Sequence, residues 1–388
     1  MQSRMSETIT IDGSHGEGGG QVLRNAISFA TILKKTIKIS KIRAGRSKPG
    51  LKAQHMTGLR ICTEIRGGVL ECCELNSTEI SYTPPTEDIP EEKIEYVGDT
   101  KTAGSICLVL QAALPVALFS RKNPTDLILK GGTNASMAPQ YDYWEEVFLP
   151  TLISKCGFPD DLIQHRVVRR GYFPRGGGEV RIEIEPWRET LPPIVLTERG
   201  EVSNIRIRSY YGGTTVPLRV AAEMAESAKK VLQEAGITVE PEVEIVNQTE
   251  AIGSGCGILL VATTTTDCLL AGSALGTPKK HATKVGREAA EELVATLKDG
   301  GCVDDWLQDQ LILFMALASG SSEMLTGSLT MHTRSAIWTA EQLSGAKFEV
   351  KRLEEVTSGV DGEGYGKDGR IPGKHLIRCT GINFVKKK

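Results

Sequence analysis

Apolar residues recur along this chain at two spacings, one typical of amphipathic helices and one typical of half-buried strands. The helical spacing predicts helices at residues 22–33, 54–65, 103–119 and 143–156. Alternation of polar and apolar residues predicts strands at residues 8–11, 36–42, 125–130 and 179–185, and a strand pair at residues 70–73 and 79–83. Because the two kinds of element alternate, we expect an α/β (α+β) fold.

Glycine pairs and triplets recur beside the predicted strands, near Gly18, Gly131 and Gly176. Glycine allows tight turns and close backbone approaches, so each group predicts a loop at a strand end. Similar segments that return along a chain are typical of internal repeats. We therefore expect an internal repeat in which pairs of helices lie on small sheets.

The pattern changes at residues 186–193, where prolines cluster. Beyond them, strands are predicted at residues 205–208, 242–246 and 257–263, with an amphipathic helix at residues 220–235. A helical, core-rich pattern returns from residue 286 to residue 319, and late strands are predicted at residues 348–352 and 376–379. We thus predict a main domain of residues 1–186 and 286–388, and a smaller α/β domain of about 100 residues inserted at 187–285. The glycine-rich, charged segment 357–372 is expected to be a mobile loop.

Positive and negative residues are nearly equal in number over the whole chain, but they are unevenly distributed along it. The formal net charge of −2 argues against a general nucleic-acid coat, which needs many basic residues over a surface. Residues 18–63, however, contain no acidic residue and carry ten basic ones, which are Arg24, Lys34, Lys35, Lys38, Lys41, Arg43, Arg46, Lys48, Lys52 and Arg60. This pattern fits either a polyanionic ligand held at one place or a solvated basic face.

The nine cysteines include no C-x-x-C pair, which argues against a zinc site and a disulfide framework. A reducing compartment is therefore expected. The N-terminus lacks the apolar core of a signal peptide. The longest apolar run, residues 107–119, is too short to span a bilayer. We expect a soluble, intracellular protein with no membrane partner.

The loop of residues 16–20, followed by Gln21 and Arg24, exposes backbone N–H groups at a helix start, where a phosphate can approach. It lacks the Lys-Ser/Thr pair of a P-loop, and a plain tight turn explains the glycines equally well. Glu17 within this loop would repel a phosphate unless a cation such as Mg²⁺ or Mn²⁺ lay between them. The alternative is an exposed acid that is stabilised by the helix dipole.

Arg43 and Arg46 flank Gly45 on a turn after a predicted strand, where both guanidinium groups could bind phosphate. Six histidines are present, at positions 15, 55, 165, 281, 332 and 375, but none has the spacing of a metalloprotease motif. No G-x-S-x-G motif indicates a serine hydrolase. The residues alone therefore indicate a phosphate-binding α/β enzyme, with a metal ion left open, and do not select one histidine.

Several glycine-rich blocks, taken in order, resemble the RNA 3′-terminal phosphate cyclase family, with its animal-type members most similar. The blocks are residues 12–24, 41–51, 100–105, 130–134, 138–140, 170–180, 307–310, 315–318, 332–333 and 340–342. They span nearly the whole chain. The resemblance implies repeated units of two helices on a four-stranded sheet, as in enolpyruvyl transferases, with a smaller α/β domain inserted.

The same resemblance implies an ATP-dependent enzyme that converts RNA 3′-phosphate ends to 2′,3′-cyclic phosphates through a covalent AMP–histidine and an RNA-adenylate. His332 matches the adenylated histidine and Glu17 matches a metal-proximal glutamate. Matches to the adenylate pocket are Gln111, Pro139, Trp306, Asp309, Gln310 and His332, and matches around the phosphates and RNA end are Arg24, Arg43, Arg46, Gln54 and Gln21. Trp306 replaces the usual tyrosine, which retains stacking but loses the phenolic hydroxyl.

The resemblance further implies ATP and a divalent metal as cofactors, RNA with a 3′-phosphate as partner, and a nuclear, nucleoplasmic location with the cytoplasm as a second one. A homodimer is one assembly that it allows. The alternative function is that of a non-catalytic cyclase-like protein in ribosomal RNA processing. That branch lacks the nucleophilic histidine, whereas His332, Arg43, Arg46 and Glu17 are present here.

Overall fold

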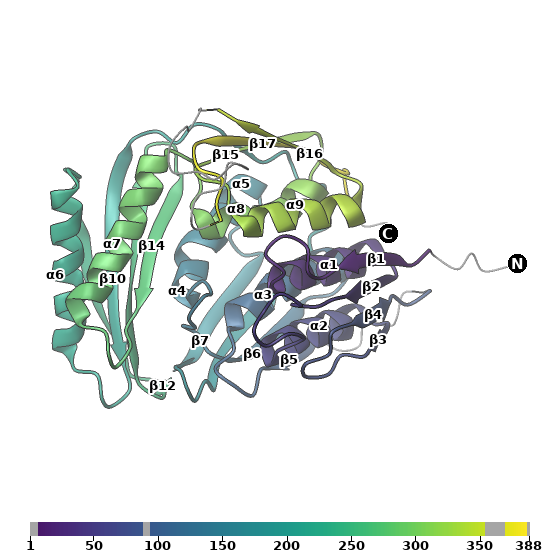
Figure 1. Cartoon of the computed structure of the whole chain (residues 1–388), viewed down its shortest axis with the longest axis horizontal. Coiled ribbons are helices and arrows are strands. Elements are labelled where there is room, and N and C mark those ends of the chain that lie inside the picture. The colour runs from purple at the N-terminus through teal and green to yellow at the C-terminus, as the bar shows by residue number, and fades with distance from the viewer. Residues whose placement is uncertain (1–6, 88–93, 354–368, 386–388) are drawn as a thin grey trace, which may run out of the picture.

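Three repeats of one β-α-β-α-β-β unit build most of the molecule in the computed structural model, which describes residues 7–87, 94–353 and 369–385 (Figure 1). The first repeat contains β1 (Ile9–Asp12), α1 (Gly20–Leu33), β2 (Ile37–Ser40), α2 (Ala53–Arg66), β3 (Val69–Glu71) and β4 (Ile80–Thr83). The second contains β5 (Glu95–Asp99), α3 (Ile106–Ser120), β6 (Thr125–Gly131), α4 (Tyr141–Tyr143), η1 (Trp144–Phe148), α5 (Leu149–Cys156), β7 (Ile163–Gly171) and β8 (Gly178–Ile184). The third contains β9 (Val195–Leu196), α8 (Asp305–Leu317), β15 (Ser321–Thr326), α9 (Met331–Ser344), β16 (Lys347–Arg352) and β17 (His375–Thr380).

The three sheets share one strand order. They run β1-β2-β4-β3, β5-β6-β8-β7 and β9-β15-β17-β16, and β12 (Ala251–Ile252) adds a fifth strand beside β7. Counted along the chain, the first two strands of each repeat pair parallel. The second and third strands both pair antiparallel with the fourth, which lies between them in the sheet. The predicted internal repeat of helix pairs on small sheets is therefore confirmed.

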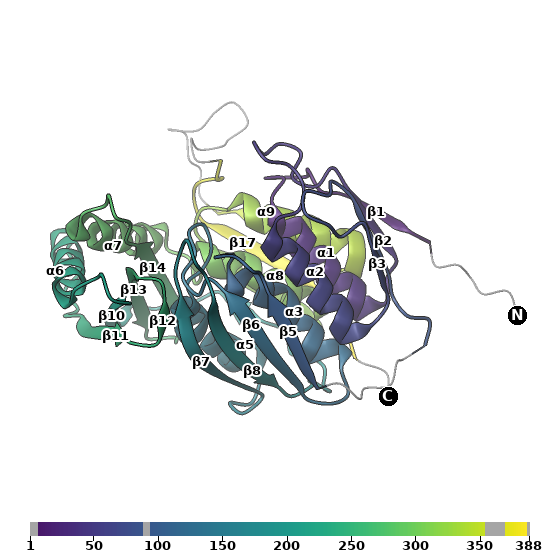
Figure 2. The same ribbon diagram turned by 90° about the horizontal axis from the view of Figure 1, so that it is seen from below.

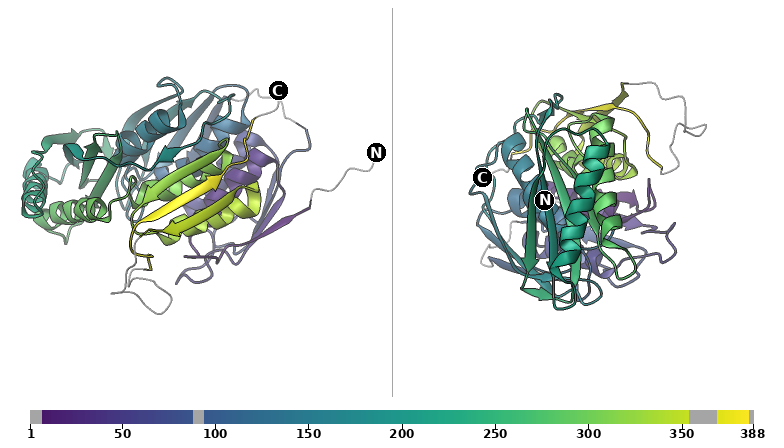
Figure 3. Two further views of the ribbon diagram at one scale, coloured as in Figure 1. Left: turned by 90° about the horizontal axis from the view of Figure 1, so that it is seen from above. Right: turned by 90° about the vertical axis from the view of Figure 1, so that its left-hand side faces the viewer.

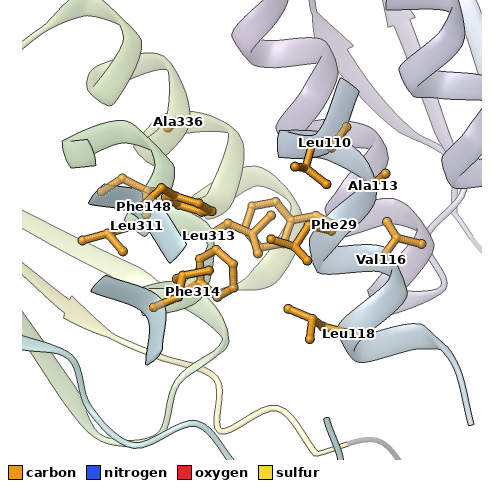
Figure 4. Close-up of a cluster of buried hydrophobic side chains, with 14 of the residues drawn as sticks. Phe29, Leu110, Ala113, Val116, Leu118, Phe148, Leu311, Leu313, Phe314 and Ala336 are labelled. Atoms are coloured by element: carbon orange, nitrogen blue, oxygen red, sulfur yellow. The ribbon is translucent and has the colours of Figure 1, made fainter. Parts of the chain in front are cut away.

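The helices of the three repeats lie between their sheets, as the views in Figures 2 and 3 show, and their buried side chains form the main core. Phe314 of α8 is 1% exposed, and its ring centroid lies 6.1 Å from Phe119, 6.3 Å from Phe148 and 6.4 Å from Phe158. Figure 4 shows this cluster receiving side chains from α1, α3, η1, α8 and α9. Buried apolar area is the dominant favourable term in folding, so this cluster fixes the helices relative to one another.

A separate unit is inserted between β9 and α8. It contains β10 (Val202–Gly212), α6 (Leu218–Glu234), β11 (Glu242–Gln248), β12 (Ala251–Ile252), β13 (Gly255–Thr264), β14 (Leu269–Leu275) and α7 (Ala282–Asp299). Its sheet runs β11-β10-β13-β14 and shares a second core with α6 and α7. The predicted boundary at residue 285 lies inside α7, whose buried Ala289 and Leu293 belong to that second core. We therefore propose that the inserted unit ends at Asp299.

Some elements were not predicted from the sequence. The elements that were missed are the helix α9 and the strands β5, β7, β9, β12, β14 and β15. After Met331 the first turn of α9 is polar, β7 is rich in arginine, and β9 and β12 have only two residues each. The continuous helical pattern at residues 286–319 is two helices, since α7 ends at Gly300 in a left-handed conformation. Most of the predicted mobile loop at residues 357–372 lies outside the described residues. No helix in the described ranges combines the length and hydrophobicity that a bilayer span needs.

The aromatic cluster generates a stability prediction. Phe314→Ala should lower the free energy of unfolding by about 3–5 kcal/mol, because it removes a buried ring and leaves a cavity. Phe173 is 80% exposed, so the matched variant Phe173→Ala should change stability by less than about 0.5 kcal/mol. Urea unfolding of both variants measures the difference, and equal losses would contradict the central position of Phe314.

Candidate active site

One cleft of about 520 Å³ brings together residues from all three repeats. Its lining contains every residue that the resemblance assigned to the site except Gln21. The lining consists of Glu17, Gly19, Gly20, Arg24, Arg43, Arg46, Lys52, Gln54, His55, Leu108, Gln111, Ser136, Met137, Pro139, Trp306, Asp309, Gln310 and His332. Gln21 is fully buried behind the cleft, and its side-chain oxygen accepts a hydrogen bond from Arg24.

The cleft lies at the starts of six helices. Its lining includes Gly19 and Gly20 at α1, Gln54 and His55 in α2, Leu108 in α3, Pro139 before α4, Trp306 in α8 and His332 in α9. Each repeat contributes two helices that begin at this cleft. A helix start presents unpaired N–H groups and a partial positive charge, so the site favours an anion.

The glycine-rich loop is shaped by crowding at the start of α1. A Cβ atom at Gly20 would lie 2.6 Å from His55 Nε2 and 2.7 Å from Arg24 Nη1. A Cβ atom at Gly19 would lie 1.6 Å from Glu17 Oε1. Any side chain at these two positions would displace a residue that lines the cleft, which explains why the sequence has glycine there.

His332 is the second residue of α9 and is held by a cap at the start of that helix. The Thr330 hydroxyl accepts from Thr333 N at 3.1 Å, and the Thr333 hydroxyl donates to Gln308 Oε1 at 2.8 Å. These bonds fix the first turn and direct the imidazole into the cleft. His332 Nε2 lies 2.8 Å from Glu17 Oε2.

Glu17 connects two cations from different repeats. Its second oxygen, Oε1, accepts a hydrogen bond from Arg46 Nη2 at 2.8 Å. The cation that a carboxylate in a phosphate loop requires is thus provided by Arg46 and His332 in this structure. Burial raises the pKa of Glu17, but the hydrogen bond and charge of His332 and the charge of Arg46 outweigh burial and hold that pKa below its usual value.

The electrostatics of the cleft favour a protonated His332. Burial lowers the pKa of His332, but the hydrogen bond to Glu17 and the negative charges of Asp309 and Glu17 outweigh it, so the pKa is raised overall. Burial raises the pKa of Asp309 to about 6 and lowers that of Arg24 to about 10. The imidazole therefore keeps its proton to a higher pH than an ordinary histidine, and it must lose that proton before it can act as a nucleophile.

Hydrogen bonds to the backbone hold two of the predicted ligand-binding side chains, Arg43 and Gln54. Arg43 Nη1 donates to the carbonyl oxygens of Lys48 and Gly50 at 2.9 and 3.0 Å. Its other terminal nitrogen has no hydrogen-bond partner among the described residues and can contact a ligand in the cleft. Gln54 Oε1 accepts from Ser105 N at 2.9 Å and so joins α2 to the start of α3.

Several cleft residues were missed by sequence reasoning. They are Lys52, His55, Leu108, Ser136 and Met137. The only signal for Lys52 in the sequence is its place in the basic stretch of residues 18–63. The only signal for His55 is that it follows Gln54. Burial, followed by the charge of Arg24, lowers the pKa of His55 to about 3, so this imidazole is neutral.

The acidic groups of the cleft are the side chains that could hold a divalent ion. No cluster of three His, Cys, Asp or Glu side chains suited to a metal exists among residues 7–87, 94–353 and 369–385. Glu17 and Asp309 are the two carboxylates in the cleft lining. Magnesium is commonly held by one or two carboxylates together with substrate phosphates. The donor set therefore fits an ion that enters with a phosphorylated ligand.

The triplicated fold and the cationic cleft around His332 define a phosphate-binding enzyme of the α/β class. A sequence model of the family described as RNA 3′-terminal phosphate cyclase matches residues 15–350. The chain is 39% identical over 381 residues to the RNA 3′-terminal phosphate cyclase of Drosophila melanogaster, which covers 98% of both proteins. The chain therefore belongs to the RNA 3′-terminal phosphate cyclase family.

Other relatives extend the comparison to distant organisms. The chain is 37% identical over 375 residues to a "Probable RNA 3'-terminal phosphate cyclase" of Dictyostelium discoideum, covering 96% of this chain and 83% of that protein. It is 37% identical over 364 residues to the RNA 3′-terminal phosphate cyclase of Pyrococcus abyssi, covering 94% of this chain and 98% of that protein.

The contact between Glu17 and His332 generates a titration prediction. Glu17→Gln should lower the pKa of His332, because the variant loses the negative charge that stabilises the imidazolium. The imidazole would then become neutral at a lower pH than in the unmodified protein. NMR titration of isotope-labelled histidine, without nucleotide and with a chelator, measures the shift. His375 is buried at Gly327 and should keep its pKa, whereas an unchanged His332 would show that the ion pair does not form in solution.

Proposed function

We propose that this protein uses ATP to convert the 3′-phosphate end of RNA into a 2′,3′-cyclic phosphate, with His332 as the residue that becomes adenylated. The observation that carries this proposal is the position of His332 at a helix start, in one cleft with Arg24, Arg43 and Arg46. Relatives named RNA 3′-terminal phosphate cyclase across nearly the full length support the same activity.

In the first step, His332 Nε2 attacks the α-phosphate of ATP, a phosphorus–nitrogen bond forms, and pyrophosphate leaves. Nε2 faces Glu17 in the free protein, so this contact must open and the imidazole must be neutral before attack. A covalent intermediate divides one difficult displacement into easier ones. The helix starts and the arginines stabilise negative charge that develops on the phosphate.

In the second step, an oxygen of the RNA 3′-phosphate attacks the AMP phosphorus and the bond to His332 breaks. The vicinal 2′-hydroxyl then attacks the RNA phosphate, releases AMP and loses its proton, which closes the ring. Both steps bring two anions together, so cations must offset their repulsion. Arg43, Arg46 and Gln54 lie on the α2 side of the cleft and would bind the RNA end, whereas Trp306 and Pro139 offer apolar surface for adenine.

A divalent ion, Mg²⁺ or Mn²⁺, is part of the proposal. Glu17 would hold it together with the phosphates of ATP, and the ion would supply charge neutralisation at those phosphates. In this arrangement Glu17 would hold the ion in place of its contact with His332. From the resemblance to animal-type members we also propose a nuclear location, with the cytoplasm as a second one. A homodimer is a separate proposal about the assembly.

The role of His332 predicts a labelling result. Incubation of the protein with α-labelled ATP and Mg²⁺ should give an acid-labile, alkali-stable label, and His332→Ala should reduce this label to background because the nucleophile is removed. His281→Ala is the matched control, since His281 lies exposed at the start of α7 in the inserted unit. Persistent label in His332→Ala would disprove the role. No label in well-folded unmodified protein would favour the non-catalytic function in ribosomal RNA processing.

The position of Arg43 predicts a substrate effect. Arg43→Ala should raise the KM for a 3′-phosphorylated RNA by roughly 10- to 100-fold, because a charged hydrogen bond to the terminal phosphate is lost. Arg287→Ala on α7 is the control, since it removes the same charge outside the cleft. Steady-state kinetics with a labelled oligonucleotide measures the change. Unchanged KM and kcat would remove Arg43 from the binding site.

A further inference from the structure

The loop between β7 and β8 presents an aromatic ring to solvent. Phe173 is 80% exposed and Met137 is 86% exposed, which makes them the two most exposed large apolar side chains among the described residues. Arg175, two positions further on, is exposed and forms no hydrogen bond or ion pair with any other described residue. Exposure of an aromatic side chain costs the favourable free energy of burial, so a contact with a ligand is a physical reason for it.

The base of this loop is rigid. Tyr172, which is buried, donates its backbone N–H to Ile252 O at 3.0 Å and accepts from Gly176 N at 2.8 Å. Gly176 has a positive φ of 63°, and a Cβ atom there would lie 2.2 Å from Thr102 O. The tip that carries Phe173 is therefore fixed in place before any ligand arrives. A fixed tip loses little conformational entropy when it binds, which is the usual advantage of preorganisation.

The loop also leaves the second sheet on the side from which residues of the cleft come. Strands β5, β6 and β7 point the same way, so their carboxyl ends meet at one edge of the second sheet. The segment that follows β5 joins this edge to the cleft, because Thr102 contacts the loop while Gly104 lies against Gln54. Met137 lines the cleft itself. The loop that carries Phe173 and the loop that carries Met137 thus leave the second sheet at the same edge, where β7 and β6 end.

We propose that Phe173, Arg175 and Met137 form a platform for the single-stranded RNA that leads to the 3′-phosphate in the cleft. This inference rests on the proposed function, since only an RNA whose end enters the cleft would pass over this edge. Single-stranded RNA is bound by stacking of bases on aromatic rings and by cations at its phosphates. Phe173 and Met137 provide the apolar contacts with a base, and Arg175 provides the cation.

The test compares RNAs of different length. Substrates are a dinucleotide and an RNA of about ten nucleotides, both ending in a 3′-phosphate. Phe173→Ala should raise the KM for the long RNA roughly tenfold and leave the dinucleotide nearly unaffected, because only the long RNA reaches the platform. Phe173→Tyr should restore the unmodified KM, whereas Phe173→Leu should not. Val69→Ala is the matched control, since Val69 is 60% exposed and follows the C-terminal end of α2, away from the cleft.

A second set of RNAs, each with one abasic site near the 3′ end, locates the base that stacks. The unmodified protein should lose affinity at one abasic position, and Phe173→Ala should show no further loss there. Self-adenylation is measured in parallel on every variant. Equal KM values for the long RNA in Phe173→Ala and unmodified protein would overturn the platform. Loss of self-adenylation in Phe173→Ala would also overturn it, because the loop would then act by shaping the cleft.

The outcomes separate this inference from the proposed function. If the unmodified protein neither self-adenylates nor cyclises RNA, the proposed function fails, and binding of labelled RNA still tests the platform directly. If it cyclises RNA and Phe173→Ala shows no length-dependent defect, the platform alone fails. A change of oligomeric state in Phe173→Ala without a change in RNA affinity would assign Phe173 to a protein contact and overturn the inference.

Discussion

The partial positive charges at the starts of six helices meet at one cleft, and the rest of the site depends on this arrangement. Helix ends of like sign repel one another, so something must hold them together. The buried cluster around Phe29, Phe148 and Phe314 does so, because it fills the space where the helices pack between the sheets. The cleft is consequently preorganised for an anion, and its arginines add positive charge there.

Glu17 sets the charge balance inside this positive site. It comes from the first repeat and His332 comes from the third, so their contact joins these two repeats across the cleft. The carboxylate offsets the charges of His332 and Arg46, which would otherwise repel each other. Glu17 therefore raises the pKa of His332 while it also holds Arg46.

The three repeats share a topology but use their loops differently. The loop after β1 carries Glu17, the loop after β5 forms part of the rim beside Gln54, and the connection after β9 holds the whole inserted unit. Asp304 ties that unit to the cleft, since one carboxylate oxygen accepts from Ala271 N of β14 at 2.9 Å and the other accepts from Trp306 N at 3.1 Å. An insertion at this point thus supports the helix that carries Trp306.

Local pattern in the sequence determined the alternation of helices and strands, the internal repeat, the inserted unit and the concentration of positive charge near Arg43. These features follow from spacings of a few residues, which hydrophobic periodicity records directly. Periodicity did not reveal α9, because its first turn is polar, and His332 was selected only by family resemblance. Tertiary structure alone decided that Gln21 lies behind the cleft, that His55 lines it and that Glu17 meets His332. Those relations join residues far apart in the chain, and packing of helices against one another sets them rather than any local spacing.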